Sequence, residues 1–167
     1  MYDELTEVDI KKMQEEINHR VRVLRPQLIE EVQIARGFGD LSENFEYKCA
    51  KQAKNRNESR IRYLERMIRT AKVIEVKGKE NAVGLFDKVT IFNEMVKKEM
   101  TIQIVTTLRQ DALKGLISKE SPVGKALLGH RVGERVLVTV SDSMQYYLTI
   151  RSIEKGEDDE SLAISSY

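Results

Sequence analysis

A short stretch in the first third of the chain brings acidic and basic side chains together. The acids are Asp40, Glu43 and Glu46, and the flanking basic residues are Arg36, Lys48, Lys51 and Lys54. Carboxylate oxygens suit Mg²⁺, an ion that usually keeps water and substrate phosphates among its ligands. One or two carboxylates would hold Mg²⁺ poorly by themselves, but they could complete a metal site that another macromolecule supplies. The alternative is that Asp40 and Glu43 only cap a helix and complement its dipole.

Few other residues are spaced for catalysis. The two histidines, His19 and His130, have neither a nucleophile nor a metal ligand at a suitable spacing, and Cys49 is the only cysteine. We expect structural or solvated roles for all three. The sequence also lacks a Walker phosphate-binding loop and a dinucleotide-binding motif. These absences argue against a self-contained enzyme.

Charge is distributed unevenly along the 167 residues, although 28 basic and 27 acidic side chains almost cancel. The net charge of +1 excludes a protein that binds nucleic acid as a bulk polycation. Residues 44–77, however, hold ten basic and four acidic side chains. A local field of this kind guides encounters with phosphates or acidic surfaces. The alternative is that these basic side chains form only the solvated face of a helix that is paired with the acidic residues 1–43.

Two helical segments are predicted to position the acidic stretch. In residues 8–36 the apolar side chains recur at alternating steps of three and four, which predicts a helix that contacts one partner. Pro26 lacks a backbone donor and predicts a kink near residues 22–26. A second seam with the same spacing covers residues 50–71; its first half is small or polar and its second half is aliphatic. We therefore expect the half of the pair near the turn to pack weakly and to stay slender.

The residues between the two seams favour a tight turn. Gly37 and Gly39 permit positive φ angles and end a helix, and Asp40 or Ser42 could cap the next one. Helices of roughly 29 and 32 residues joined by a short turn form an antiparallel hairpin with arms about 45 Å long. Such a hairpin projects as a finger, because two helices bury too little apolar surface to form a globule.

From residue 78 on, the apolar pattern changes from helical to alternating. Four β-branched or aromatic runs are predicted to be strands: Val83–Phe92, Thr101–Leu108, Arg135–Val140 and Gln145–Ile153. Ser121, Pro122 and Gly129 predict a short helix, with Ser as its N-cap, Pro at its first position and Gly after its end. The fold class is therefore α+β, with a two-helix coiled-coil hairpin over residues 1–77 and a small antiparallel-sheet domain over residues 78–167. We expect its acidic residues 156–160 to form a frayed tail.

Two motifs resemble one known family. Residues 35–47, ARGFGDLSENFEY, resemble the tip motif of the bacterial Gre transcript-cleavage factors, AR-x-x-GDLSEN-x-EY. Besides the acids, the matching positions of this tip, which covers residues 37–47, are Gly39, Ser42, Asn44 and Tyr47. Residues 115–129 resemble the family's IS-x-x-SP-x-x-x-AL-x-G segment. The order of hairpin and small domain also agrees. Leu41 is similar to the GreA branch, whereas the basic second helix is closer to GreB; we favour the GreA branch.

The resemblance implies an accessory factor of RNA polymerase and not an enzyme. In this family the second domain is FKBP-like and docks at the mouth of the polymerase secondary channel, here with Ser121 and Pro122. The hairpin reaches the active centre of a backtracked complex, where Asp40 and Glu43 would hold a Mg²⁺ jointly with RNA polymerase. The isolated protein would bind no cofactor. The polymerase then cleaves the nascent RNA with its own two-metal site.

The resemblance also implies a basic patch near the tip. Arg36 and Lys51 match this patch and would contact phosphates at the 3′ end of the backtracked RNA, and Lys54 and Arg56 could extend it. Phosphate contacts position a nucleic acid without reading its sequence, so we expect no sequence preference.

The chain departs from the family pattern at the tip and in one loop. Phe38 and Phe45 stand where the motif more often has His and Ala, and these rings could pack on each other or stack on a displaced RNA base. Residues 106–111 have lost most acids of the family's loop after the second strand. That change concerns affinity for the polymerase more than chemistry.

Two other functions remain open. A related secondary-channel protein that inhibits the polymerase would share the fold but rearrange its tip acids, so the presence of both Asp40 and Glu43 argues against it. A prolyl isomerase would need an aromatic-lined pocket, for which residues 83–153 offer four aromatic side chains and no Trp. The sequence shows no transmembrane stretch and no signal peptide. We therefore expect a cytoplasmic monomer with no membrane partner.

Overall fold

The chain forms two compact units. A computed structural model describes residues 3–40, 43–76 and 78–166. The first unit contains Ile10–Ala71, and the second contains Asp3–Asp9 together with the residues from Lys72 on. No helix of these described ranges is long and apolar enough to cross a membrane.

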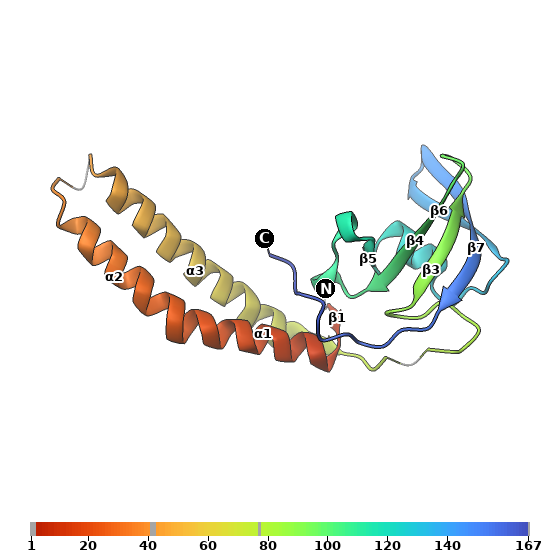
Figure 1. The fold of residues 1–167 in the computed structure, drawn as a ribbon, viewed down its shortest axis with the longest axis horizontal. Coiled ribbons are helices and arrows are strands. Elements are labelled where there is room, and N and C mark those ends of the chain that lie inside the picture. Colours follow the sequence, from red (N-terminus) through yellow and green to blue (C-terminus); the bar gives the residue numbers. More distant parts are fainter. Residues whose placement is uncertain (1–2, 41–42, 77, 167) are drawn as a thin grey trace. The chain divides into compact units, whose positions relative to one another are not determined.

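The first unit is a hairpin of two long helical arms (Figure 1). One arm consists of α1 (Glu7–His19), a π-helical turn η1 (Arg20–Leu24) and α2 (Arg25–Arg36), and the other arm is α3 (Phe45–Thr70). The side chains buried in this unit include Ile17, Val32, Ala35, Ile61 and Leu64. They lie at positions of the two predicted seams or beside them, so the periodicity located the helix contact correctly.

The π-helical turn lies immediately before Pro26. The N–H of Arg25 bonds to the carbonyl of Arg20, five residues earlier. Pro26 has no N–H and its ring crowds the carbonyl four residues before it, which disturbs the α-helical ladder at this point. Asn57 of α3 contacts the first arm at this turn. Its Nδ2 donates to the Arg20 carbonyl at 3.2 Å, and its Oδ1 accepts from Arg20 Nη1 at 3.0 Å. The predicted seam position 57 is therefore a polar contact between the arms.

Ion pairs join the same part of the hairpin. Arg60 Nε and Nη2 donate to the two oxygens of Glu16 at 2.8 and 3.2 Å, and Arg20 Nε donates to Glu16 Oε1 at 2.8 Å. Burial raises the pKa of Glu16, but the hydrogen bonds and charges of the two arginines outweigh it, so the pKa lies below its ordinary value of 4.5. A carboxylate with a lowered pKa stabilises the folded state at any pH above that ordinary value.

Glu16→Gln should therefore destabilise the protein near neutral pH and not in acid. We expect a loss of about 2 kcal/mol at pH 7, the size of a hydrogen bond to a charged group. Because the folded pKa is lowered, the advantage of the wild type should disappear as the pH falls from 4.5 through the folded pKa. Thermal unfolding of both proteins at neutral and at acidic pH measures this difference. A difference that stays constant with pH would contradict the prediction.

The second helix is shorter than expected. The prediction of roughly 32 residues is wrong, because α3 has 26 and ends at Thr70. The chain turns into a short strand there: β2 (Lys72–Val73) pairs in parallel with β1 (Glu4–Leu5). The N–H of Lys72 donates to the carbonyl of Asp3 at 2.9 Å, and that of Ile74 donates to Leu5 at 2.8 Å. These bonds require an extended backbone.

The second unit is built on a five-stranded sheet with the order β5-β4-β3-β7-β6 (Figure 1). Its strands are β3 (Lys88–Asn93), β4 (Lys98–Val105), β5 (Leu116–Ser118), β6 (Arg135–Ser141) and β7 (Met144–Glu154). All neighbours pair antiparallel except β4 and β5. The helix α4 (Pro122–Leu127) has Ser121 as its N-cap and buries Leu127 against the sheet residues. The predicted α+β class and the short helix are confirmed.

Three predicted strand boundaries are wrong: β3 begins at Lys88 and not at Val83, and β4 covers Lys98–Val105 and not Thr101–Leu108. Residues 83–87 lie outside the sheet and contain a turn at residues 85–86. Asp87 Oδ2 accepts from the N–H of Gly84 at 2.7 Å and pairs with Lys155 Nζ at 2.5 Å, which holds this segment in place. Phe86 within this segment has a φ of 67°, which a strand does not allow. Residues 107–109 form a 3₁₀ turn after β4.

The acidic tail is not frayed, in contrast to the expectation. Asp158 pairs with Arg109 Nη1, and the same Nη1 donates to the carbonyl of Asp159 at 3.1 Å. Further along, Leu162 packs against the buried Phe86 cluster, and the N–H of Ser165 donates to the carbonyl of Leu108 at 2.6 Å. The tail follows the edge of its unit because a buried arginine holds it there.

Candidate functional site

The turn of the hairpin forms a hollow whose walls are acidic and aromatic. The described residues that line it are Phe38, Asp40, Glu43, Asn44, Phe45 and Glu46, and its volume is about 580 Å³. The N–H of Phe38 still bonds to the carbonyl of Ala35 at 3.1 Å, and Gly39 then takes a φ of 122°, which only glycine adopts readily. The N–H of Glu43 donates to the carbonyl of Asp40 at 3.3 Å. The backbone thus turns within a few residues. Gly39 takes the positive φ that the sequence predicted, whereas Gly37 has a φ of −72°.

Asn44 closes the hairpin at this end. Its Oδ1 accepts from the N–H of Tyr47 at 3.0 Å, which makes it the N-cap of α3, and its Nδ2 donates to the carbonyl of Ala35 at 2.6 Å. One side chain therefore satisfies backbone groups at the ends of both helices. The expectation that Asp40 or Ser42 caps α3 is wrong for Asp40, since Asn44 is the cap; Ser42 lies outside the described residues.

Removing this side chain should loosen the tip. We expect Asn44→Ala to cost about 1 kcal/mol or more, because a cap and a link between the helices are lost together. Amide hydrogen exchange should speed up in the first turn of α3, most directly at Tyr47. Asn55→Ala is a matched control, since Asn55 is exposed inside α3 and alanine is the better helix former. Equal exchange in both variants would contradict the assigned role of Asn44.

Asp40 and Glu43 remain exposed at the tip. Asn44 is the N-cap of α3, and Glu43 precedes the cap. Glu46 lies in the first turn of α3, where an acid complements the helix dipole. Among the residues that the structure describes, no group of three or more acidic, histidine or cysteine side chains is arranged to hold a metal ion. Two exposed carboxylates nevertheless fit a cation whose remaining ligands come from elsewhere.

The predicted basic residues are only partly brought together. Arg36 and Lys51 lie over the ring of Tyr47, with the guanidinium carbon 5.7 Å and the ammonium nitrogen 6.0 Å from its centre. This places two cations from different helices on one aromatic side chain. The sequence motif included Tyr47 but gave it no role. Tyr47 and Lys51 are four residues apart on a predicted helix, and this spacing could have predicted their contact.

The other two predicted cations lie elsewhere on α3. Lys54 is half-buried, and its charge contributes to lowering the pKa of Glu58, a carboxyl that is held mainly by Arg25. Arg56 is exposed but lies about 140° around the helix from Lys51. Arg56 therefore lies on another face of α3 than Lys51, whereas Lys54 follows Lys51 by one helical turn.

In the second unit, the predicted docking residues lie at the start of α4. Ser121 Oγ accepts from the N–H of Gly124 at 3.0 Å and donates to the carbonyl of Ser118 at 2.6 Å. Its hydroxyl thus has a structural role. Pro122 is exposed in the first turn of the helix.

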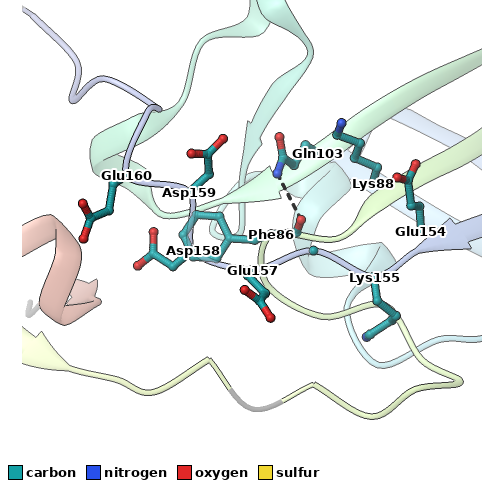
Figure 2. A pocket seen from close by; sticks show the side chains of 10 residues that line it. Phe86, Lys88, Gln103, Glu154, Lys155, Glu157, Asp158, Asp159 and Glu160 are labelled. Carbon is teal, nitrogen blue, oxygen red and sulfur yellow. Dashed lines mark hydrogen bonds between the residues drawn. The ribbon is translucent and has the colours of Figure 1, made fainter.

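A second hollow, of about 430 Å³, lies between Phe86 and the acidic tail (Figure 2). Its lining includes Gln103, whose Nε2 donates to the carbonyl of Phe86 at 3.0 Å, and the four acids Glu157–Glu160. Asp158 and Lys155 are engaged with Arg109 and Asp87 respectively. The polar groups of this hollow stabilise the unit, and their arrangement indicates no catalytic chemistry.

Two family descriptions match successive parts of the chain. Residues 4–73 match "Transcription elongation factor, N-terminal", and residues 78–155 match "Transcription elongation factor, GreA/GreB, C-term". The first range covers the hairpin with its acidic tip, and the second covers most of the sheet unit.

Relatives with the name transcription elongation factor GreA are similar over most of their length. The protein of Mesoplasma florum is 42% identical over 80% of this chain and 86% of its own, and that of Geobacillus kaustophilus is 43% identical over 80% and 85%. The solved structure of GreA factor homolog 1 of Thermus thermophilus is 25% identical, covers 93% of this chain and 100% of its own, and has a TM-score of 0.42. The identity and coverage of the GreA proteins, together with the two family matches, show that this chain belongs to the GreA/GreB family of transcription elongation factors.

Proposed function

We propose that this Gre-type factor binds RNA polymerase, inserts its hairpin tip into the secondary channel and stimulates cleavage of backtracked nascent RNA. The polymerase would perform the hydrolysis with its own two-metal active site. The protein would contribute part of that site and would not be an enzyme by itself.

The observation that carries the proposal is the exposure of Asp40 and Glu43 on one tip hollow, where Asn44 already supplies the helix cap. Among the described residues no third acidic, histidine or cysteine side chain joins them in a metal-binding group. Two carboxylates suit a Mg²⁺ that is shared with the polymerase. Such an ion stabilises charge on the attacking and leaving oxygens of a phosphodiester. In this account the tip binds that ion in the complex and orients a water beside it, while the isolated protein has no cofactor.

Arg36 and Lys51 would hold the RNA. Both cations border Tyr47 at the end of the hairpin, so phosphates of the extruded 3′ segment could bind between them. Lys54, one turn along α3 from Lys51, would extend this contact, and Arg56 would add longer-range attraction only. These contacts position the RNA and read no sequence. The sheet unit would dock on the polymerase through the exposed Pro122 and the neighbouring Ser121, with one copy of the chain per polymerase.

An RNA cleavage assay on stalled, backtracked elongation complexes tests the proposal. Addition of the protein at fixed Mg²⁺ should increase the rate at which the 3′ segment is released, compared with buffer alone. An unchanged rate would contradict the proposal. If the protein also blocked a known cleavage factor, the result would instead indicate an inhibitor with the same fold.

A further inference from the structure

Two phenylalanine rings are exposed at the tip. Phe38 is 65% exposed and Phe45 is 76% exposed, and both line the same hollow as Asp40 and Glu43. Rings that remain this accessible add little to the stability of the hairpin, because the free energy gained from an apolar side chain scales with the area that it buries. Together the two rings offer an apolar surface beside the carboxylates.

We infer that Phe38 and Phe45 form a stacking platform for unpaired nucleobases at the 3′ end of the extruded RNA. This inference rests on the proposed function and adds to it the group that the tip recognises. The rings would be positioning residues: they would hold the last nucleotides of the RNA so that the phosphodiester to be cleaved lies beside the two carboxylates.

Cations and aromatic rings occur together at the end of the hairpin, and this combination favours a nucleic acid as the occupant. A single-stranded RNA presents anionic phosphates and flat aromatic bases in alternation, and proteins bind it by combining cations with aromatic side chains. The tip offers both at neighbouring places: Arg36 and Lys51 border Tyr47, and the two phenylalanines line the hollow together with the acids. Phosphates would bind at the cations beside Tyr47, and the bases would contact the rings. A purely apolar partner such as a lipid tail would have to desolvate Asp40, Glu43 and Glu46, which share the hollow, at a high cost.

Stacking also agrees with a factor that must act at any position of a transcript. Every base has a π-face, so a stacking platform tolerates all sequences. Phe38 and Phe45 stand on either side of the acids in the chain, one before Asp40 and one after Glu43. A base that contacts either ring is therefore held close to the carboxylates.

The test is a thermodynamic cycle between the ring and the base. Cleavage is measured on backtracked complexes whose extruded nucleotides either carry their bases or are abasic, with each rate divided by the rate without factor. The proteins are the wild type, Phe38→Ala, Phe45→Ala and Phe45→Trp, with Asp40→Asn included to test the proposed function separately. Ile34→Ala is the matched control, because Ile34 is 55% exposed on α2 and does not line the hollow. Circular dichroism checks that all variants are folded.

On RNA with bases, each alanine variant should lose about tenfold in stimulated rate or in apparent affinity, the size expected for a base stacked on an aromatic ring. Phe45→Trp and Ile34→Ala should stay within about twofold of the wild type. On abasic RNA, the wild type should fall to the level of the alanine variants, and the alanine variants should lose little more.

Three results would overturn the inference. An equal loss on both RNAs would mean that the rings contact the polymerase and not the RNA. Activity of the alanine variants at the wild-type level would mean that the rings contact nothing in the complex. If the wild type stimulates no cleavage, the proposed function fails and the stacking role fails with it. If the wild type stimulates and Asp40→Asn does not, while the alanine variants match the wild type, only the stacking role is wrong.

Discussion

Asp40→Asn and Glu43→Gln should each reduce stimulated RNA cleavage by at least about 100-fold, a loss of about 2.7 kcal/mol in transition-state stabilisation. Both substitutions keep the size of the side chain and remove the negative charge that a shared Mg²⁺ needs. Asn44 caps α3 and links the helices in either variant, so the tip should keep its shape. The loss should therefore appear in the cleavage rate and not in binding to the polymerase.

Glu46→Gln is the matched control for these variants. Glu46 lines the same hollow but lies in the first turn of α3, where its charge complements the helix dipole. We expect it to retain at least half of the stimulated rate, with a small loss of helix stability. Binding of each variant is measured by competition with the wild type. A loss in Glu46→Gln as large as in the other two would indicate a general electrostatic effect of the tip.

Arg109→Met should destabilise the sheet unit by about 3–5 kcal/mol. Arg109 is 1% exposed; its Nε donates to Asp9 Oδ1 at 2.7 Å, its Nη1 pairs with Asp158, and its guanidinium lies 5.2 Å from the centre of the Phe86 ring. Asp9 is fully buried. Methionine has a similar length but no charge, so the variant leaves the Asp9 carboxylate buried without its ion pair.

Chemical unfolding followed by circular dichroism measures this loss. Arg131→Met, which removes an exposed cation of the same unit, should change the free energy of unfolding by less than about 0.5 kcal/mol. The double variant Asp9→Asn/Arg109→Met should be more stable than Arg109→Met alone, because it removes the charge that was left unpaired. If the double variant were less stable than the single one, the unpaired charge would not be the cause of the loss.

The sequence predicted the helical hairpin and its tip well, because both depend on local pattern. The apolar residues that are spaced three and four apart lie on the contact face of each helix. Gly39 takes the positive φ that the turn requires. In the sheet, alternating side chains identified β6 and β7, whose register is antiparallel.

The features that the sequence did not predict depend on contacts between distant residues. Asp40, Ser42 and Asn44 can all cap a helix, and the choice of Asn44 involves the carbonyl of Ala35 on the other helix. The local pattern of residues 83–87 predicted a strand. The ion pair between Asp87 and Lys155 joins residues far apart in the chain, so the local pattern could not reveal it. Arg109 is buried only because Asp9 and Asp158, near opposite ends of the chain, both reach it.

The central claim, that the tip carboxylates complete a metal site in the polymerase, is tested most directly by a Mg²⁺ titration of the cleavage rate. Backtracked complexes are titrated with Mg²⁺ in buffer, with the wild type and with Asp40→Asn at saturating concentration. Two additional carboxylate ligands should allow half-maximal cleavage at about tenfold or more lower Mg²⁺ with the wild type than in buffer. With Asp40→Asn the half-maximal concentration should return toward that of buffer. An identical Mg²⁺ dependence for all three would contradict a metal role for these carboxylates, even if the wild type accelerated cleavage.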